Sequence, residues 1–257
     1  MRTHLLLSLI TITILTAFGY AEPAESTSKP SILITGANRG LGLELCKQYL
    51  KQGYIVYGTA RKPEKATELQ ATDTIILPLD VTSQESIDAL AQQLRGKPLD
   101  ILINNAGYFG PNPIGTRMDA IWTLSREEIE NCHAVNTMGP LFVTKALIPN
   151  VQLGKMKKII NMSTCSSMLS RKGGGAMGYR ISKAGLNMVT VVLSAQLKQL
   201  DIIVISAAPG HNKTDMGTDM GNLLPSQSMP QLMKVIDELT MEQTGGFWYY
   251  NGKNLPW

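Results

Sequence analysis

Short runs of apolar, often β-branched residues alternate with longer mixed stretches from Ser31 to the end of the chain. Such short runs are typical of strands buried on both faces, and apolar residues that recur at helical spacing are typical of helices. We predict strands over Ser31–Thr35, Tyr54–Thr59, Thr74–Leu79, Leu99–Asn104, Lys158–Met162, Ile202–Ala207 and, with a weaker pattern, Phe247–Tyr250. We predict helices over Gly42–Gln52, Pro63–Gln70, Ser83–Leu94, Ser125–Pro149, Tyr179–Leu200 and Met229–Thr240.

This alternation of strand and helix predicts an α/β fold, a Rossmann-type doubly wound parallel sheet of about seven strands with helices on both faces. Right-handed crossovers between the strands place a ligand crevice at their carboxyl ends. Neither a composition shift nor an internal repeat divides residues 31–257. We therefore expect one domain over that range.

The N-terminal residues have a different character. Arg2 precedes the apolar run Leu5–Phe18, and small residues lead up to Ala21. This pattern predicts a secretory signal peptide over residues 1–21 and a polar linker over residues 22–30. The run is shorter than the roughly 20 apolar residues of a bilayer-spanning helix, so no permanent membrane anchor is expected. The signal predicts export to a periplasm or secretory lumen, and a cytoplasmic location is the alternative if the segment does not function.

Composition narrows the class of protein further. Hydrophobic residues make up 44% and charged residues 17% of the chain, as in globular proteins with a packed core. The net charge of +4 is small and the basic residues are scattered, so no nucleic-acid partner is expected. Cys46, Cys132 and Cys165 are odd in number and widely spaced, which favours thiols over a disulfide framework or a metal site.

A glycine-rich run, Thr35–Gly42, falls between the first predicted strand and the first predicted helix. Glycines at such a turn let the backbone approach a pyrophosphate that sits on the helix N-terminus. The alternative is an ordinary strand-to-helix loop, because a lone glycine-rich turn is a weak signal. The candidate cofactor-binding residues of this turn are Gly36, Asn38, Arg39, Gly40, Leu41 and Gly42.

Charged residues at the ends of the next two strands indicate which dinucleotide fits. Arg61 ends the second strand, where an acidic residue would hold the ribose 2′-hydroxyl of NAD, so it favours the 2′-phosphate of NADPH. Arg39 is a second candidate for the same phosphate, and solvated surface arginines are the alternative. Asp80 and Val81 end the third strand, where Asp80 either hydrogen-bonds the adenine or caps the next helix.

Tyr179 and Lys183 lie four residues apart at the start of a predicted helix, so their side chains share one face. A phenol has an ordinary pKa of about 10, and a neighbouring ammonium lowers that pKa by stabilising the phenolate. The pair therefore predicts a general acid for carbonyl reduction. The spacing alone is common on helix surfaces, where such a pair has no catalytic role.

Several motifs occur together in the order and spacing of the short-chain dehydrogenase/reductase family, which the chain resembles from about Ser31 to its end. They are Thr35–Gly42, Asn104–Gly107, Asn136, Tyr179–Lys183 and Pro209–Gly210. Three further segments resemble the sniffer-like and C-factor-like carbonyl reductases: Tyr179–Asn187, Lys213–Gly217 and Gly246–Trp257. The resemblance implies a proton-relay role for Asn136 and a contact of Lys183 with the nicotinamide ribose. It implies further cofactor contacts for Asn105, Ala106, Gly107, Pro209, Gly210 and Thr214.

Two positions depart from the family pattern. Thr164 stands where the family has its catalytic serine, so Thr164 is the candidate, with Ser163 and Ser166 as competitors. Thr still donates a hydrogen bond to a carbonyl oxygen. His211 and Asn212 replace the Trp-Val that usually follows Pro-Gly in the subgroup, which puts the family's contacts there in doubt. A catalytic role for His211 is not favoured, because a lone loop histidine is usually solvated.

The expected function is an NADPH-dependent oxidoreductase that moves a hydride between the nicotinamide and a small carbonyl or alcohol. Tyr179 is the expected general acid, and substrate choice is expected within residues 212–231, a stretch that could close as a lid. The alternative is a cofactor-binding signalling or regulatory protein of C-factor type with little turnover. The resemblance also implies a homo-oligomer, a dimer or tetramer, paired through the long helices Ser125–Pro149 and Tyr179–Leu200.

Overall fold

A computed structural model describes residues 29–111, 121–122, 124–173 and 175–257, so the predicted signal peptide lies outside the described residues. A parallel sheet of seven strands runs through the middle of the molecule, in the order β3-β2-β1-β4-β5-β6-β7. The strands are β1 (Ser31–Ile34), β2 (Ile55–Ala60), β3 (Ile75–Pro78), β4 (Ile101–Asn104), β5 (Lys158–Met162), β6 (Ile203–Ala208) and β7 (Phe247–Tyr249). The predicted fold class is confirmed.

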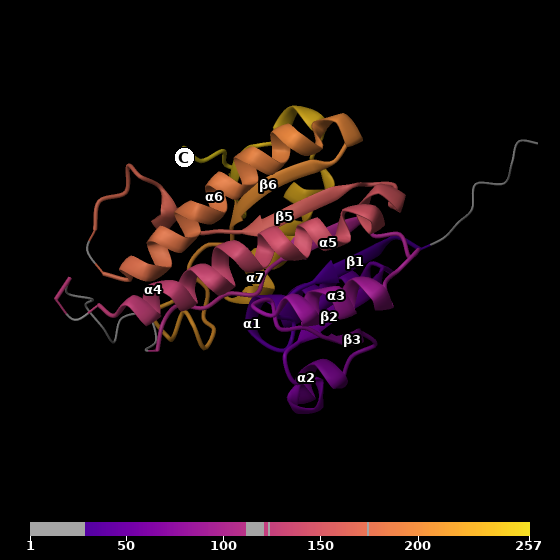
Figure 1. Cartoon of the computed structure of the whole chain (residues 1–257), viewed down its shortest axis with the longest axis horizontal. Helices are drawn as coiled ribbons and strands as arrows, with labels where there is room; N and C mark the ends of the chain where they lie inside the picture. Colours follow the sequence, from indigo (N-terminus) through magenta and orange to yellow (C-terminus); the bar gives the residue numbers. More distant parts are fainter. Residues whose placement is uncertain (1–28, 112–120, 123, 174) are drawn as a thin grey trace, which may run out of the picture.

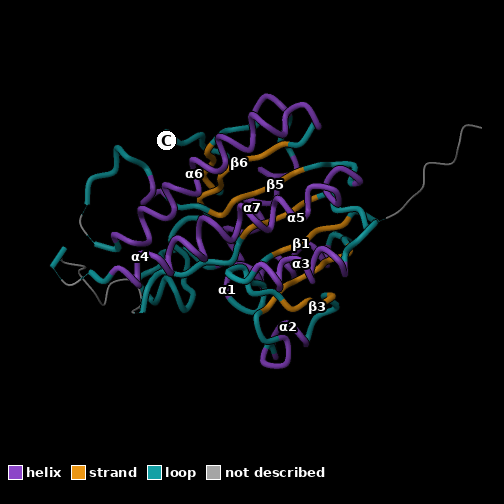
Figure 2. The backbone as a smooth tube through the Cα atoms, viewed as in Figure 1, coloured by secondary structure: helices purple, strands orange, loops and turns teal. Residues whose placement is uncertain are grey.

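Helices cover both faces of this sheet (Figure 1). They are α1 (Gly40–Lys51), α2 (Thr67–Gln70), α3 (Gln84–Gln93), α4 (Arg126–His133), α5 (Gly139–Leu153), α6 (Met177–Leu197) and α7 (Pro225–Asp237). Figure 2 shows the helices and strands alternating along the backbone, as the sequence pattern predicts. No helix in the described ranges is long and apolar enough to cross a lipid bilayer.

Two hydrophobic cores separate the helices by face. Ile32 and Ile34 of β1 point into a core shared with α1, α2 and α7, whereas Leu33 points into a core shared with α3, α5 and α6. Successive side chains of a strand point to opposite faces, so one apolar strand contributes side chains to both cores. The strands are therefore held rigidly, and their carboxyl ends form a fixed edge for a site.

The predicted helix Ser125–Pro149 is interrupted and longer than expected. It consists of α4, a π-helical turn over Ala134–Met138, and α5, which continues past Pro149 to Leu153. Proline removes one backbone donor, but the packing of α5 into its core holds the helix through that position. The π-turn inserts an extra residue, a distortion that is frequent at functional sites.

The predicted helix Met229–Thr240 begins one turn earlier, at Pro225. Proline is favoured in the first turn of a helix because its missing N–H has no partner there in any case. The Gln227 side chain also accepts a hydrogen bond from the Leu224 backbone N–H at 2.9 Å, which secures the helix start. The first part of the stretch predicted to form a lid is thus a loop, and the rest is helix α7.

Candidate active site

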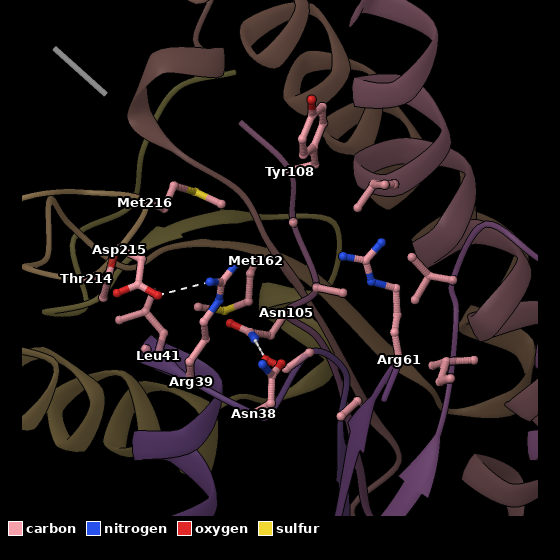
Figure 3. A pocket seen from close by; sticks show the side chains of 18 of the residues that line it. Asn38, Arg39, Leu41, Arg61, Asn105, Tyr108, Met162, Thr214, Asp215 and Met216 are labelled. Carbon is pink, nitrogen blue, oxygen red and sulfur yellow. Dashed lines mark hydrogen bonds and ion pairs between the residues drawn. The ribbon is translucent and has the colours of Figure 1, made fainter. Parts of the chain in front are cut away.

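A cavity of about 830 Å³ opens at the carboxyl ends of the strands (Figure 3). Its size falls in the upper part of the range of about 300–1,000 Å³ that is usual for ligand pockets. Fifteen of the residues predicted to form the site line it: Gly36, Asn38, Arg39, Gly40, Leu41, Arg61, Asp80, Val81, Asn105, Ala106, Gly107, Tyr179, Lys183, Pro209 and Thr214. Residues from distant parts of the chain therefore meet on one surface, as the parallel sheet requires.

The glycine-rich turn is braced against the end of β4. The Asn105 side-chain amide donates to the Thr35 carbonyl at 2.9 Å and to the Gly36 carbonyl at 3.1 Å. Gly36 has a φ of +63°, and a Cβ there would lie 2.8 Å from the Ala106 Cα. A side chain at this position would therefore strain the backbone and collide with Ala106, in the segment that follows β4.

Two predicted cofactor residues, Gly42 and Gly210, are not among the residues that line the cavity. A Cβ on Gly42 would overlap the Gly36 carbonyl oxygen, so this glycine lets α1 pack closely behind the turn. A Cβ on Gly210 would lie 2.6 Å from Leu223 Cδ1, so that glycine permits close packing behind the Pro209 turn. Both residues therefore shape the cavity from behind.

One end of the cavity is basic. Arg61 lies at the end of β2, and Lys62 and Lys65 line the cavity beside it. Figure 3 shows the Arg61 guanidinium directed into the cavity. Asp80 lies near by: burial raises the pKa of its carboxyl, but hydrogen bonds from Thr82 and the Arg61 charge outweigh burial and hold that pKa below its usual value. The cationic groups outnumber this one carboxylate, so this end suits an anion.

Arg39 also lines the cavity and has an acidic partner. Its guanidinium pairs with the Asp215 carboxylate at 3.0 Å, and both side chains are largely exposed (Figure 3). Asp215 belongs to residues 211–224, here termed the cleft loop, which connects the turn after β6 to α7. Arg39 lines the same cavity as Arg61, so the prediction that both reach one phosphate stays a prediction. Arg39 also joins the glycine-rich turn to the cleft loop.

Tyr179 and Lys183 lie at the opposite end of the cavity, in the first turns of α6. The Lys183 ammonium donates to the Met162 carbonyl at 2.6 Å and lies 5.9 Å from the centre of the Tyr179 ring. The Phe109 ring packs against the Tyr179 ring with centroids 5.0 Å apart, which limits the positions that the phenol can take. The pair thus shares one face, as the spacing predicts.

The direction of the Tyr179 pKa differs from the sequence expectation. Burial raises the pKa of Tyr179 to about 12, and the side-chain hydrogen bond with Thr164 opposes that rise. Burial also lowers the pKa of Lys183 to about 8. The expected lowering by the ammonium is absent because both groups are desolvated and Lys183 is held by Met162. Of these two groups, Lys183 is therefore the one whose pKa lies closer to neutrality.

Among the three candidates for the serine role, Thr164 is the one whose side chain is hydrogen-bonded to Tyr179, although Ser163 and not Thr164 is among the residues that line the cavity. The Ser163 hydroxyl is buried and donates to Asn187 Oδ1 at 2.6 Å, so its proton is directed away from the cavity. Ser166 contacts Thr164 through its backbone: the Ser166 N–H donates a hydrogen bond to Thr164 Oγ1 at 3.2 Å. That bond uses one of the two lone pairs of the Thr164 oxygen, and the other hydrogen bond of this hydroxyl joins it to Tyr179.

The Asn136 side chain is fully engaged in the π-helical turn. Its Oδ1 accepts from the Tyr108 N–H at 2.8 Å, and its Nδ2 donates to the Tyr108 carbonyl at 2.7 Å and to Ser182 Oγ at 3.0 Å. Asn136 is fully buried and is not among the lining residues. Its amide therefore holds the backbone after β4 in place, and the proton-relay role that the resemblance implies for Asn136 stays a prediction.

Several lining residues were not predicted, namely Ala60, Lys62, Lys65, Leu79, Tyr108, Val135, Met162, Asp215 and Met216, in addition to the competitor Ser163. The cluster of basic residues that follows Arg61 in the sequence was a signal for Lys62 and Lys65. Tyr108 directly follows the predicted Gly107. Asp215 and Met216 fall within residues 212–231, the stretch expected to set substrate choice. Met162 has no such signal, because methionine in a sequence is usually a core residue.

Known proteins are similar to this chain in sequence and in fold. A family model described as short chain dehydrogenase matches residues 30–222. An uncharacterized oxidoreductase of Schizosaccharomyces pombe is 34% identical over 261 residues, covering 90% of this chain and 100% of that protein. The structure of the carbonyl reductase Sniffer of D. melanogaster has a TM-score of 0.81 at 32% identity and covers 89% of this chain and 100% of its own. The structure of an NADPH-bound carbonyl reductase from chicken fatty liver has a TM-score of 0.80 at 30% identity, covering 89% and 99% respectively.

Proposed function

Because this chain belongs to the short-chain dehydrogenase/reductase family, an oxidoreductase family, we propose that it is an NADPH-dependent reductase of small carbonyl compounds. The observation that carries the proposal is the cavity itself, which has Arg61 at one end and Tyr179 beside Lys183 at the other. The similar chicken liver carbonyl reductase is NADPH-bound, which supports the same cofactor here.

The residues present fit this cofactor. The glycine-rich turn offers a close backbone approach at the start of α1, which suits a pyrophosphate. The extra phosphate of NADPH would find cationic donors in Arg61, Lys62 and Lys65. The residue at the end of β2 is Arg61, and not the carboxylate that holds the ribose 2′-hydroxyl in NAD-binding proteins. These residues would hold the adenosine half, and Lys183 would hold the nicotinamide ribose.

The proposed reaction divides the work between cofactor and protein. When bound, NADPH supplies the hydride for the carbonyl carbon. The Tyr179 hydroxyl gives its proton to the carbonyl oxygen, and the Thr164 hydroxyl orients that oxygen by donating a hydrogen bond. The Lys183 ammonium stabilises the negative charge that develops on the Tyr179 oxygen as its proton leaves. The Phe109 ring packs against the Tyr179 ring and so limits its movement.

A panel of small aldehydes and ketones tests this proposal. NADPH oxidation is followed at 340 nm with the purified protein, and a sample without protein is the control. Turnover of at least one carbonyl with NADPH is expected, together with slower turnover with NADH. Binding of NADPH without turnover of any carbonyl would instead support a cofactor-binding regulatory role.

The pH profile depends on Lys183. Because the pKa of its ammonium is lowered to about 8, the charged form is lost as the pH rises through that value. We expect kcat/KM for reduction to fall above about pH 8, since neutral Lys183 no longer stabilises the Tyr179 phenolate. In Lys183→Arg the guanidinium stays charged, so the fall should shift to higher pH. Profiles of the same shape in both proteins would exclude Lys183 as the titrating group.

We propose further that two copies of the chain pair through α5 and α6. Both helices carry exposed apolar residues, here called the apolar patch: Met138 and Leu153 at the two ends of α5, and Ile181, Met188, Val191 and Val192 on α6. An apolar surface of this kind marks an interface. Met188, whose surface is 62% exposed, lies within this patch.

Met188→Glu is therefore expected to dissociate the dimer or tetramer into monomers, because a buried unpaired carboxylate costs several kcal/mol. Size-exclusion chromatography with light scattering measures the mass. Ile75→Glu is the control, since Ile75 is an exposed apolar residue on β3, outside the patch. A wild-type monomer, or a Met188→Glu protein of unchanged mass, would contradict this assembly.

The location in the cell is a separate proposal. We propose that residues 1–21 direct export and are then removed, which is supported by the basic start and apolar run of that segment. N-terminal sequencing of the protein from its native cells should begin at Glu22. A sequence that begins at residue 1 or 2 would indicate a cytoplasmic protein.

A further inference from the structure

The cleft loop, residues 211–224, lies against the cofactor cavity at its tip. Thr214, Asp215 and Met216 line the cavity. Asp215 pairs with Arg39, and Met216 Cε lies 3.7 Å from where a Cβ on Gly107 would be. The tip therefore reaches from the end of β6 to the glycine-rich turn and to the end of β4.

The base of the cleft loop is closed by main-chain hydrogen bonds. The Lys213 N–H donates to the Leu223 carbonyl at 2.8 Å, and the N–H groups of Asn222 and Leu223 donate to the His211 carbonyl at 3.0 and 3.2 Å. The His211 ring also contacts the Gly217 carbonyl at 3.1 Å through Nε2. The loop is thus a closed unit, and its position depends on what holds its base.

Asn212 connects that base to two fixed elements. Its side-chain amide donates to the Pro209 carbonyl at 2.8 Å and to the Gly210 carbonyl at 3.3 Å, just after β6. Its Oδ1 accepts from the Ser228 hydroxyl of α7 at 2.6 Å. Asn212 is 4% exposed and Ser228 is fully buried, so water does not compete for these bonds.

Glycines pack against the same residue. A Cβ on Gly217 would overlap the Asn212 carbonyl oxygen, and a Cβ on Gly221 would overlap the Asn212 backbone. The loop therefore folds tightly around Asn212 from both sides. An apolar residue of similar size at position 212 would fill the space but would leave the Pro209 carbonyl and the Ser228 hydroxyl without these partners.

We propose that Asn212 is a positioning residue for the cofactor, because it fixes the cleft loop between β6 and α7 so that Thr214 and Met216 close over bound NADPH. The exposed pair Arg39 and Asp215 then acts as a contact that opens at little cost when the nucleotide enters or leaves. This inference rests on the proposed cofactor.

Ser228→Ala tests the proposal without altering a residue that lines the cavity. The variant removes the donor to Asn212 Oδ1. Ser194→Ala is the matched control, because Ser194 is also a buried helical serine whose hydroxyl donates to Val191, on α6. The Kd of NADPH, from its fluorescence on binding, is expected to rise about three- to tenfold in Ser228→Ala and to stay unchanged in Ser194→Ala.

Hydrogen exchange supplies a readout that does not depend on the cofactor. Without added nucleotide, the amides of Lys213, Thr218 and Leu223 should exchange slowly in the wild type, because each donates a backbone hydrogen bond. They should exchange faster in Ser228→Ala and as in the wild type in Ser194→Ala.

Fast exchange of these amides in the wild-type protein would overturn the proposal even if Ser228→Ala fails to fold. Unchanged NADPH affinity in a folded Ser228→Ala protein would also overturn it. If the wild type exchanges slowly but does not bind NADPH, the proposed cofactor fails, and with it the assigned role of Asn212.

Discussion

Replacing Tyr179 with phenylalanine is expected to lower kcat/KM for carbonyl reduction by about 10²–10⁴-fold, the usual contribution of a positioned general acid. Phenylalanine keeps the ring that packs against Phe109, so the wall of the cavity is preserved. Only the hydroxyl that bonds to Thr164 is lost. Steady-state kinetics with the best substrate from the carbonyl panel measures the effect.

The affinity for NADPH should stay within a few-fold of the wild type, because the 2′-phosphate end of the cavity is distant from Tyr179 in the proposed binding mode. Fluorescence titration measures the Kd. Thr164→Val is the companion variant: it removes the partner hydroxyl at nearly constant size and should cost less than the loss of Tyr179. A Tyr179→Phe protein with near wild-type turnover would show that another group donates the proton.

Arg61→Asp is expected to reduce kcat/KM for NADPH by about 100-fold and to raise the relative use of NADH. Each hydrogen bond to a charged group contributes about 1.5–3 kcal/mol, and a carboxylate at this position also repels the 2′-phosphate. An acidic residue at the end of the second strand is moreover the usual partner of the ribose 2′-hydroxyl in NAD-binding proteins. Kinetics with both dinucleotides at one fixed carbonyl concentration measures the ratio.

Neighbouring cations serve as internal controls for this effect. Lys62→Ala and Lys65→Ala should each weaken NADPH binding less than the loss of Arg61, because a lysine offers a point charge rather than a bidentate fork. Arg39→Ala should change the NADPH Kd by no more than about fivefold, since its exposed guanidinium pairs with Asp215. An unchanged preference for NADPH in Arg61→Asp would show that the 2′-phosphate does not bind at the end of β2.

The state of the cysteines bears on the proposed export. Cys46, Cys132 and Cys165 are thiols in the structure, and burial raises the pKa of the Cys46 thiol to about 12. A thiol with so high a pKa is a poor nucleophile even in an oxidising compartment. The thiol form of Cys46 therefore agrees with the proposed export as well as with a cytoplasmic location.

The fold was predictable from the sequence because its signals are local. The apolar runs of β1, β4 and β6 and the helical periodicity of α1 and α3 each arise from neighbouring residues, and their alternation leaves little choice of topology. The boundaries were less predictable. Pro149 lies inside α5 because the hydrophobic core outweighs the cost of proline, and no local pattern reports that balance.

The sequence by itself determined the sheet, the glycine-rich turn and the shared face of Tyr179 and Lys183, since these follow from residues close together in the chain. Only the tertiary structure decided that Thr164 bonds to Tyr179, that Arg39 pairs with Asp215, and that Asn212 joins β6 to α7. It also reversed the expected direction of the Tyr179 pKa, because burial depends on every element packed around a group. Hydrogen-bond partners and desolvation are properties of the folded chain, and residue spacing does not encode them.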